Sequence, residues 1–533
     1  MMGKEPKKHL VRMEKNGTIY VYESESYWDS GKKQPRSRRK LIGHEDPETG
    51  MVVPNRGYSK ELTYARTYVS GPHLLFDTIT ERIGLKGILR DTLPKDADGI
   101  LTCAYYMLSE GKALSRCEQW SAGAVTPLMR RFGDQRISEM LDRLKKDNQM
   151  RFFNRWVSKA AENDTYALDI TSISSYSDEI GIVRAGYNRD HENLEQINLA
   201  LLIGSETYRP LFYSILPGNI NDRSSLRRFV GVVNSIGLTK FRIVMDKGFC
   251  TKANIDVLYE EQMKFTMSLT GNLKFAQDAI TEAKPGIVQF SNCRQILNSK
   301  VFLTTSLKDW NGHRCYTHVY YDETKKDKDT ARFMDRLLRC RGMLEDGVSV
   351  PERDRPFCER FFTVKETPKR GKKVIPNEEE IASFREKDAG FLVLISNCEK
   401  NPVKCLEIYR AKETAESGFD DLKNDDDLYR MRVHTEYRMD GKMFVAFIAL
   451  AIKMELNRVI YSDDDLKNRS VQEVIDEMKL LRSTFIEGRR KPFHTELTKL
   501  QKTVMKTFGI SGEFDINQPE SADDDGIRTY SET

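Results

Sequence analysis

The sequence predicts an α/β fold built around a mixed β-sheet, and three observations lead to this fold class. Short apolar segments at residues 166–169, 197–203 and 210–216 have the length and composition of three consecutive strands. From residue 225 to residue 269, helix-like and strand-like patterns then alternate. A strand pattern near residue 390 and a long apolar helix at 443–456 follow much later. The sheet is therefore expected to be interrupted by a long insertion.

Composition limits the class of protein. A chain of 533 residues is too long for one hydrophobic core, so several folded units are expected. The net charge of +5 is only mildly basic and does not by itself select a nucleic-acid partner. The nine cysteines form no Cys-x-x-Cys pair, which favours reduced thiols over a zinc site. No apolar run reaches about 18 residues, so we expect a soluble cytoplasmic protein without a membrane segment.

The first 60 residues predict small β structure. Asn16-Gly17 is a strong hairpin turn between two strand-like segments. A cluster of six cations, beside Tyr27 and Trp28, comprises Lys32, Lys33, Arg36, Arg38, Arg39 and Lys40. Clustered charge of this kind suits contact with a phosphate backbone. A solvated basic loop explains the cluster equally well.

Three further regions flank the core pattern. Residues 72–160 show helical spacing, which suits a DNA-binding helical module and many other helical domains equally. Residues 271–390 contain short strand candidates and the charge-rich stretch 325–332, and are expected to form an inserted subdomain. Residues 466–533 predict two amphipathic helices and an acidic tail.

Two aspartates follow apolar strand segments of the core. Asp169 closes the segment 166–169, and Asp246 directly follows the buried strand expected at 241–245. Loops at the carboxyl edge of a sheet can bring ligands together without disturbing the core. Each aspartate alone reads as an ordinary turn or cap residue. Only in combination with the spaced helix face at 409–423 do they indicate a site.

A third carboxylate lies in the stretch 409–423. At about 100° per residue, a helix would place four side chains within an arc of roughly 60°, namely Tyr409, Lys412, Glu416 and Lys423. This face carries a carboxylate flanked by two ammonium groups and a phenol. With Asp169 and Asp246 it would form an all-oxygen cage suited to Mg²⁺ or Mn²⁺, and two such ions serve phosphodiester chemistry.

These motifs resemble the DDE transposases of bacterial insertion sequences. The resemblance rests on Asp169, on Asp246-Lys-Gly-Phe249 and on the spacing Tyr-x2-Lys-x3-Glu-x6-Lys. More narrowly, the last motif resembles the insertion-sequence-four superfamily, which has arginine where this chain has Lys412. That exchange replaces a planar fork with a point charge.

The resemblance implies an RNase H-like core that holds two Mg²⁺ or Mn²⁺ ions on Asp169, Asp246 and Glu416. It implies that Tyr409, Lys412 and Lys423 hold the DNA end through its phosphates. The β-rich insertion would help to hold a flipped base. No motif places Trp310 in that role, so a core position is favoured for this residue.

The division into domains follows from these patterns. We expect a basic β-hairpin domain at 1–60, a helical DNA-binding domain at 61–160, catalytic core at 161–270 and 391–460, a β-rich insertion at 271–390, and a helical C-terminal region with an acidic tail at 461–533.

The expected function is a transposase that cleaves the ends of an insertion sequence and joins them to target DNA. Its partners would be double-stranded DNA, carrying terminal inverted repeats or a target site, and a second copy of the chain. Amphipathic segments near residues 471–485 suit a dimer interface or packing within the monomer. Three alternatives stay open: a nuclease that never joins ends, a catalytically silent DNA-binding protein, and a structural protein without nucleic acid.

Overall fold

The computed structural model describes most of the chain. The described residues are 8–29, 31–47, 50–55, 65–159, 165–175, 180–186, 194–219, 222–238, 241–271, 273–296, 299–352, 354–367, 371–387, 389–412, 430–431, 435–486 and 491–511. The chain divides into two compact units. Unit 1 contains Met1–Thr80, Ser115–Asp134 and Val459–Thr533, and unit 2 contains Glu81–Leu114 and Gln135–Arg458.

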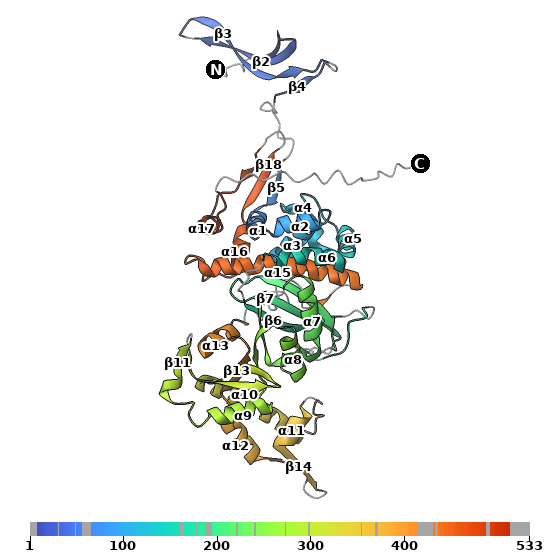
Figure 1. The fold of residues 1–533 in the computed structure, drawn as a ribbon. Coiled ribbons are helices and arrows are strands. Elements are labelled where there is room, and N and C mark those ends of the chain that lie inside the picture. The colour runs from blue at the N-terminus through green and yellow to red at the C-terminus, as the bar shows by residue number, and fades with distance from the viewer. Residues whose placement is uncertain are drawn as a thin grey trace, which may run out of the picture. The chain divides into compact units, whose positions relative to one another are not determined.

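A mixed sheet forms the centre of unit 2 (Figure 1). In the described part of the chain it runs in the order β11-β12-β13-β16-β10-β9-β6-β7-β8, with β17 (Arg430–Met431) beside β6. Its first five strands along the chain are β6 (Thr165–Ser175), β7 (Gln196–Gly204), β8 (Pro210–Pro217), β9 (Arg242–Met245) and β10 (Lys264–Ser268). The predicted α/β class with a mixed sheet is confirmed.

Strand direction changes within these five strands. β6, β7 and β8 pair antiparallel, whereas β9 is parallel to β6 and β10 is parallel to β9. The parallel pairs need crossover connections, which are supplied by α7 (Asp222–Ser235) and α8 (Lys252–Glu260). Thr251 caps α8 by accepting a hydrogen bond from the backbone N–H of Asn254.

The insertion extends the same sheet. β16 (Phe391–Ser396) pairs antiparallel with both β10 and β13 (His313–Tyr321), and β12 (Ser299–Trp310) and β11 (Cys293–Ile296) complete this side. Its inner side chains bury a common cluster that includes Leu303, Tyr320 and Leu394. The strands of the insertion are therefore continuous with the core.

The charge-rich stretch 325–332 is helical. It belongs to α10 (Glu323–Glu345), which Asp322 caps by accepting from the backbone N–H of Lys325 at 3.1 Å. Phe333, Leu337 and Cys340 bury one side of α10. The other elements of the insertion are α9 (Lys274–Ala283), α11 (Arg355–Phe361), β14 (Phe362–Thr367), β15 (Gly371–Pro376) and α12 (Glu378–Lys387).

Helices cover the β8 side of the sheet in unit 2 (Figure 1). They are α2 (Leu85–Thr92), α3 (Ala97–Glu110), α5 (Asp134–Arg143), α6 (Lys146–Val157) and α15 (Glu436–Ser462), the last of which enters unit 1 after Arg458. Phe153 of α6 lies 4.9 Å from the ring of Phe212 on β8 and 5.2 Å from that of Phe447 on α15. Such edge-to-face contacts fix the helices on the sheet.

The long apolar helix predicted at 443–456 is confirmed as the central part of α15. Gly441 lies where α15 crosses α5, and a Cβ at this position would stand 2.6 Å from the carbonyl oxygen of Leu141. Only glycine permits so close an approach. None of the helices in the described residues combines the length and apolar character that a membrane span requires.

Unit 1 contains a small antiparallel sheet of four strands, β1 (Lys8–Lys15), β2 (Thr18–Asp29), β3 (Gln34–Glu45) and β4 (Val52–Pro54). Asn16 and Gly17 connect β1 to β2 with φ values of 54° and 76°. Two successive positive φ angles are the signature of the two-residue hairpin turn that Asn-Gly favours. The predicted hairpin is confirmed.

The remaining described elements of unit 1 include a second sheet. β18 (Arg482–Ile486) lies between β5 (Ala65–Val69) and β19 (Phe493–His494). Its helices are α4 (Cys117–Gly123), α16 (Val471–Lys479), α17 (Lys499–Phe508) and most of α1 (Gly71–Arg82).

The apolar side of α16 is covered within the chain. Val474, Ile475 and Met478 are buried, and Ser470 and Glu473 form a capping box at its start. The helical prediction for residues 471–485 is wrong beyond Lys479, because the chain then enters β18, which pairs with β5. The amphipathic helix thus packs within the monomer, which is one of the two predicted alternatives.

Candidate active site

Asp169 and Asp246 lie side by side on neighbouring strands. β6 and β9 run parallel with Leu168 opposite Met245, so the next residues of the two strands are the two aspartates. Asp246 keeps an extended backbone, with φ −79° and ψ 168°, and side-chain alternation therefore continues past the end of β9. The two carboxylates share one face of the sheet, on strands about 4.8 Å apart.

Asp169 does not end its strand, contrary to the sequence-based expectation. β6 continues to Ser175. The segment after Asp169 is rich in Ser and Thr, and its pairing with β7 continues through Ser172 opposite Asn198. Asp169 accepts a 2.8 Å hydrogen bond from the backbone N–H of Ile170 and is partly buried.

Asp246 has three further partners. The hydroxyl of Tyr409 donates to Oδ1 of Asp246 at 2.8 Å, and the backbone N–H of Lys247 also donates to this carboxylate. Burial raises the pKa of Asp246, but the Lys412 ammonium, these two hydrogen bonds and the Lys247 ammonium outweigh it and lower the pKa below its ordinary value. The surroundings therefore hold Asp246 in its charged form.

Tyr409 comes from α13 (Pro402–Arg410), which begins after the cap residue Asn401. The helix ends at Arg410, and Lys412 lies just beyond it, with its ammonium 5.7 Å from the ring centroid of Tyr409. The prediction of a single helix over residues 409–423 is therefore wrong at its start. The Tyr409 and Lys412 side chains still come together at Asp246.

Two residues of the predicted site, Glu416 and Lys423, lie outside the described residues. Within the described part of the chain, no group of three or more His, Cys, Asp or Glu side chains could hold a metal ion. The donor chemistry of the described pair nevertheless fits a hard divalent cation, because two carboxylates at one level of a sheet repel each other until a cation lies between them. Asp169 and Asp246 can supply two of the ligands for such an ion.

A cavity of about 1290 Å³ opens beside this site. Asp246, Lys247, Tyr409 and Arg410 line one part of it, and residues of α10 line another. The charge-rich stretch 325–332 was not predicted to be helical, and its basic residues were not among the predicted site residues. The sequence does contain a helical signal here, because Thr324, Lys328 and Arg332 recur every fourth residue after the cap at Asp322.

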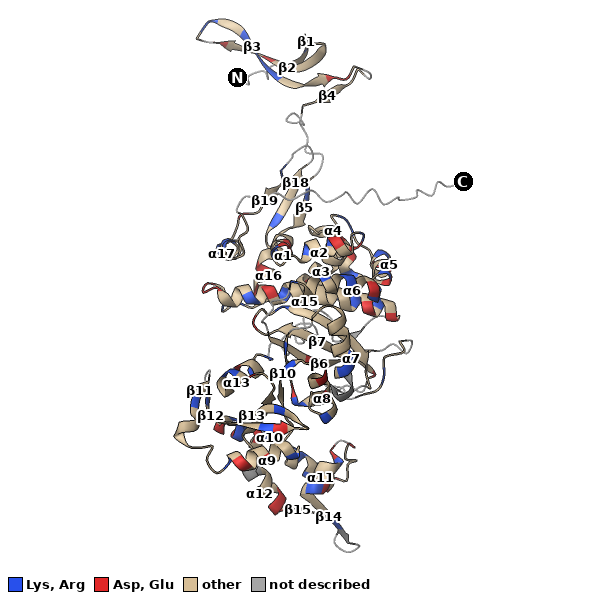
Figure 2. Ribbon diagram, viewed as in Figure 1, with Lys and Arg blue, Asp and Glu red and all other residues tan. Residues whose placement is uncertain are grey.

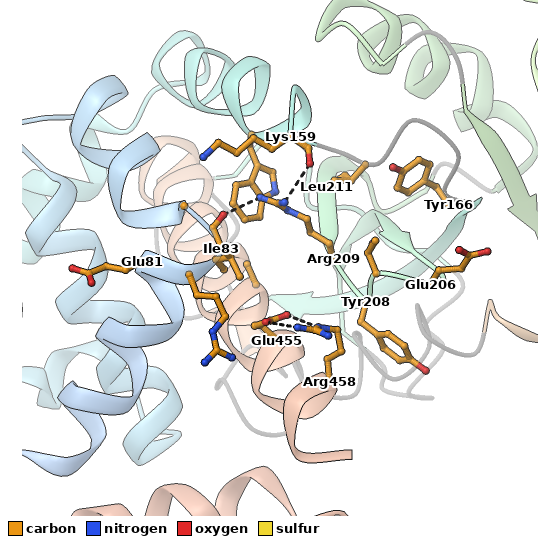
Figure 3. Close-up of a pocket in the computed structure, with 15 residues that line it drawn as sticks. Glu81, Ile83, Lys159, Tyr166, Glu206, Tyr208, Arg209, Leu211, Glu455 and Arg458 are labelled. Atoms are coloured by element: carbon orange, nitrogen blue, oxygen red, sulfur yellow. Dashed lines mark hydrogen bonds and ion pairs between the residues drawn. The ribbon is translucent and has the colours of Figure 1, made fainter. Parts of the chain in front are cut away.

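A second cavity of unit 2, of about 770 Å³, has a different character (Figure 3). The Arg209 guanidinium stacks 3.7 Å from the Trp156 ring centroid and donates hydrogen bonds to the carbonyl oxygens of Ile83 and Lys159. Arg458 pairs with Glu455 through two 2.7 Å hydrogen bonds. Arg209 thus joins different elements of the unit, whereas Arg458 is paired within α15.

The basic cluster near the N-terminus lies on the ribbon formed by β2 and β3 (Figure 2). Its six cations are all exposed. On the ribbon, Arg38 lies opposite Glu25 and Lys40 opposite Glu23, while Arg36 lies 3.4 Å from Asp29. Lys32 and Lys33 occupy the turn at the tip. The charge of the cluster is thus partly compensated across the strands.

Trp310 is a core residue, as predicted. It is only 7% exposed, and its ring packs edge to face with Phe275 at 4.9 Å. A buried indole has no face available for a DNA base.

Comparison with known proteins identifies one family. The family described as transposase DDE domain matches residues 161–452, which include both aspartates and the stretch 409–423. No curated protein matches the chain. Among solved structures, piggyBac transposase in a synaptic complex with hairpin DNA matches with 9% identity and a TM-score of 0.36, covering 82% of this chain and 73% of that chain.

Proposed function

The chain belongs to the transposase DDE domain family, and on this premise we propose that it cuts the ends of an insertion sequence and joins their 3′-hydroxyl groups to target DNA. The observation that carries the proposal is the placement of Asp169 and Asp246 at one level of two parallel strands. Within the family, the spacing from Tyr409 to Lys423 supports the insertion-sequence-four superfamily.

The proposed core is RNase H-like. The order β8-β7-β6-β9-β10 supports this assignment. β6, β7 and β8 pair antiparallel, and β9 and β10 run parallel to β6 on its other side. Asp169 lies on the central strand and Asp246 on its parallel neighbour. The carboxylates thus extend from the most deeply supported part of the sheet.

Asp169, Asp246 and Glu416 are the proposed ligands of two Mg²⁺ or Mn²⁺ ions. When bound, such ions activate the attacking oxygen and stabilise the leaving oxygen of a phosphodiester. Tyr409 orients Asp246 through its hydrogen bond, and Lys412 keeps that carboxylate charged. The contribution of the chain is positioning and charge neutralisation, without a covalent intermediate.

The substrate in this proposal is double-stranded DNA. Lys412 and Lys423 contact phosphates at the cleaved end, with Tyr409 beside them, and the cluster from Lys32 to Lys40 contacts the backbone elsewhere. Two copies of the chain act together on paired ends.

The proposal is tested with purified full-length protein and a linear duplex that carries the inverted repeats flanking the coding region. We expect cleavage at the repeat ends in Mg²⁺, loss of cleavage in EDTA, and joining of a pre-cleaved end to a target plasmid. Cleavage without joining would identify a nuclease. Binding without metal-dependent cleavage would identify a silent DNA-binding protein, and either result would overturn the proposal.

A further inference from the structure

One face of α10 lines the cavity beside Asp246. Thr324, Lys328 and Arg332 are spaced four residues apart and fall within an arc of about 80° on the helix. All three contribute to the wall of the cavity, as does Lys325. The basic and acidic bands of this helix are visible in Figure 2.

Two of the carboxylates that line the cavity, Asp322 and Asp329, are engaged by protein groups. Asp322 caps α10 and lies 3.9 Å from the guanidinium of Arg410. Asp329 forms an ion pair with Lys325 and accepts from the backbone N–H of Gly390 at 3.1 Å. Neither acid is therefore available to neutralise the two remaining cations of the stripe.

Lys328 and Arg332 are those two cations, and both are exposed. Within the described residues, neither side chain takes part in an ion pair or hydrogen bond. Like charges four residues apart destabilise a helix by a few tenths of a kcal/mol. An anion between or beside them would remove that cost.

The next basic residue of α10 provides a contrast. Arg336 donates to Asp354 at 2.8 Å and stacks 3.9 Å from the ring of Phe357, so it is used to attach α11. Of Lys328, Arg332 and Arg336, which follow one another at four-residue spacing, the two that line the cavity are thus the two without an acidic partner in the described residues.

We propose that Lys328 and Arg332 bind backbone phosphates of the DNA strand whose reacting phosphate lies at Asp246. This inference rests on the proposed function, since the cavity joins the α10 face to Asp246 and Tyr409. A DNA strand with one phosphate at Asp246 would place its neighbouring phosphates in the part of the same cavity that Lys328 and Arg332 line. The insertion, through α10, then forms part of the substrate site.

The test measures DNA binding without requiring catalysis. Full-length Lys328→Gln/Arg332→Gln protein is titrated in EDTA with a fluorescently labelled duplex carrying one inverted repeat, at several salt concentrations. Each phosphate contact contributes about 0.9 to the slope of log K against log salt. We expect the slope of the double variant to fall by about 2 relative to the unsubstituted protein.

The matched control is Lys326→Gln/Arg339→Gln, which removes two exposed cations of α10 that do not line the cavity. We expect its slope to stay unchanged. Equal slopes for the control, the cavity variant and the unsubstituted protein would overturn the inference, and so would equal losses in both variants. Unchanged thermal unfolding of both variants confirms that they fold.

The same variants separate this inference from the proposed function. If the unsubstituted protein binds DNA but never cleaves it, the proposed function fails, while the binding slopes still decide the role of α10. If it cleaves normally and the cavity variant cleaves with an unchanged KM and binding slope, the proposed function stands and the α10 inference is overturned.

Discussion

The phenolic hydroxyl of Tyr409 donates a 2.8 Å hydrogen bond to Oδ1 of Asp246, 163 positions earlier in the chain. A phenol has a single proton to donate. In this geometry that proton is directed to the carboxylate and cannot also be donated to a DNA phosphate. The geometry makes Tyr409 a positioning residue for Asp246, in addition to any contact its ring makes with DNA.

Removing this hydrogen bond should be measurable without DNA. We expect Tyr409→Phe to lower the free energy of unfolding by about 1–3 kcal/mol, because the part-buried Asp246 carboxylate loses a donor. Chemical denaturation at pH 7 measures this difference. Titration with Mn²⁺ reports whether Asp246 is still oriented to bind a metal ion. Tyr461→Phe is the control, since Tyr461 is 66% exposed. Equal losses in the two variants would contradict the positioning role.

The same hydrogen bond predicts a dependence on pH. The folded-state pKa of Asp246 lies below the ordinary value of 3.8 for this side chain, so its stabilising contribution is present above pH 3.8 and is lost as the pH falls through the lower folded-state pKa. The stability difference between Tyr409→Phe and the unsubstituted protein should therefore shrink below pH 3.8. A difference that stays constant through this range would show that Asp246 is not the partner that matters.

Loss of either aspartate should abolish cleavage. We expect Asp246→Asn and Asp169→Asn to reduce the cleavage rate far more than tenfold, which corresponds to about 1.4 kcal/mol, because each would remove a charged ligand. End binding should be largely retained. Asp278→Asn, an exposed residue of α9, serves as the control. Cleavage within tenfold of the unsubstituted protein would remove the assigned roles.

The crossing of α15 and α5 predicts a selective effect of adding one methyl group. Gly441→Ala should lower the unfolding free energy by about 1–3 kcal/mol, because the new Cβ would overlap the backbone of Leu141. Gly342→Ala in α10 meets no atom within 4 Å and should stabilise its helix by up to about 1 kcal/mol. Thermal unfolding of both variants decides between close packing and a general intolerance of helical substitutions.

The N-terminal ribbon predicts unequal contributions from its cations. Lys32→Gln/Lys33→Gln should reduce the salt dependence of DNA binding by a slope of about 2. Arg38→Gln/Lys40→Gln should reduce it less, because Glu25 and Glu23 lie opposite these residues. Fluorescence titration at several salt concentrations measures both slopes. A larger loss in the second variant would show that the acids do not compensate these cations.

The sequence predicted what depends on local pattern. Asp169 and Asp246 each follow a short apolar run, which predicts that they lie near each other, and the parallel pairing of β6 and β9 confirms this placement. The hairpin at Asn16-Gly17 follows from two residues that tolerate positive φ. These features need no information from distant parts of the chain.

Other features depend on partners far away in sequence. Residues 325–332 showed no helical apolar pattern, because the buried side of α10 begins only at Phe333. Short strand candidates were predicted for β12 and β13 but not for β11, β14 or β15, and the pairing of the insertion with β10 through β16 had no local signal. The bond between Tyr409 and Asp246 likewise joins residues whose patterns are independent.

The continuity of the sheet through β16 has a mechanical consequence. β16 hydrogen-bonds to β10 on one edge and to β13 on the other, so the insertion cannot swing as a hinged lid without breaking one of these two backbone ladders. β9, which Asp246 directly follows, and the strands β11 to β13 of the insertion thus belong to one hydrogen-bonded sheet. In the proposed reaction, this continuity favours adjustment of the DNA over a hinged movement of the insertion.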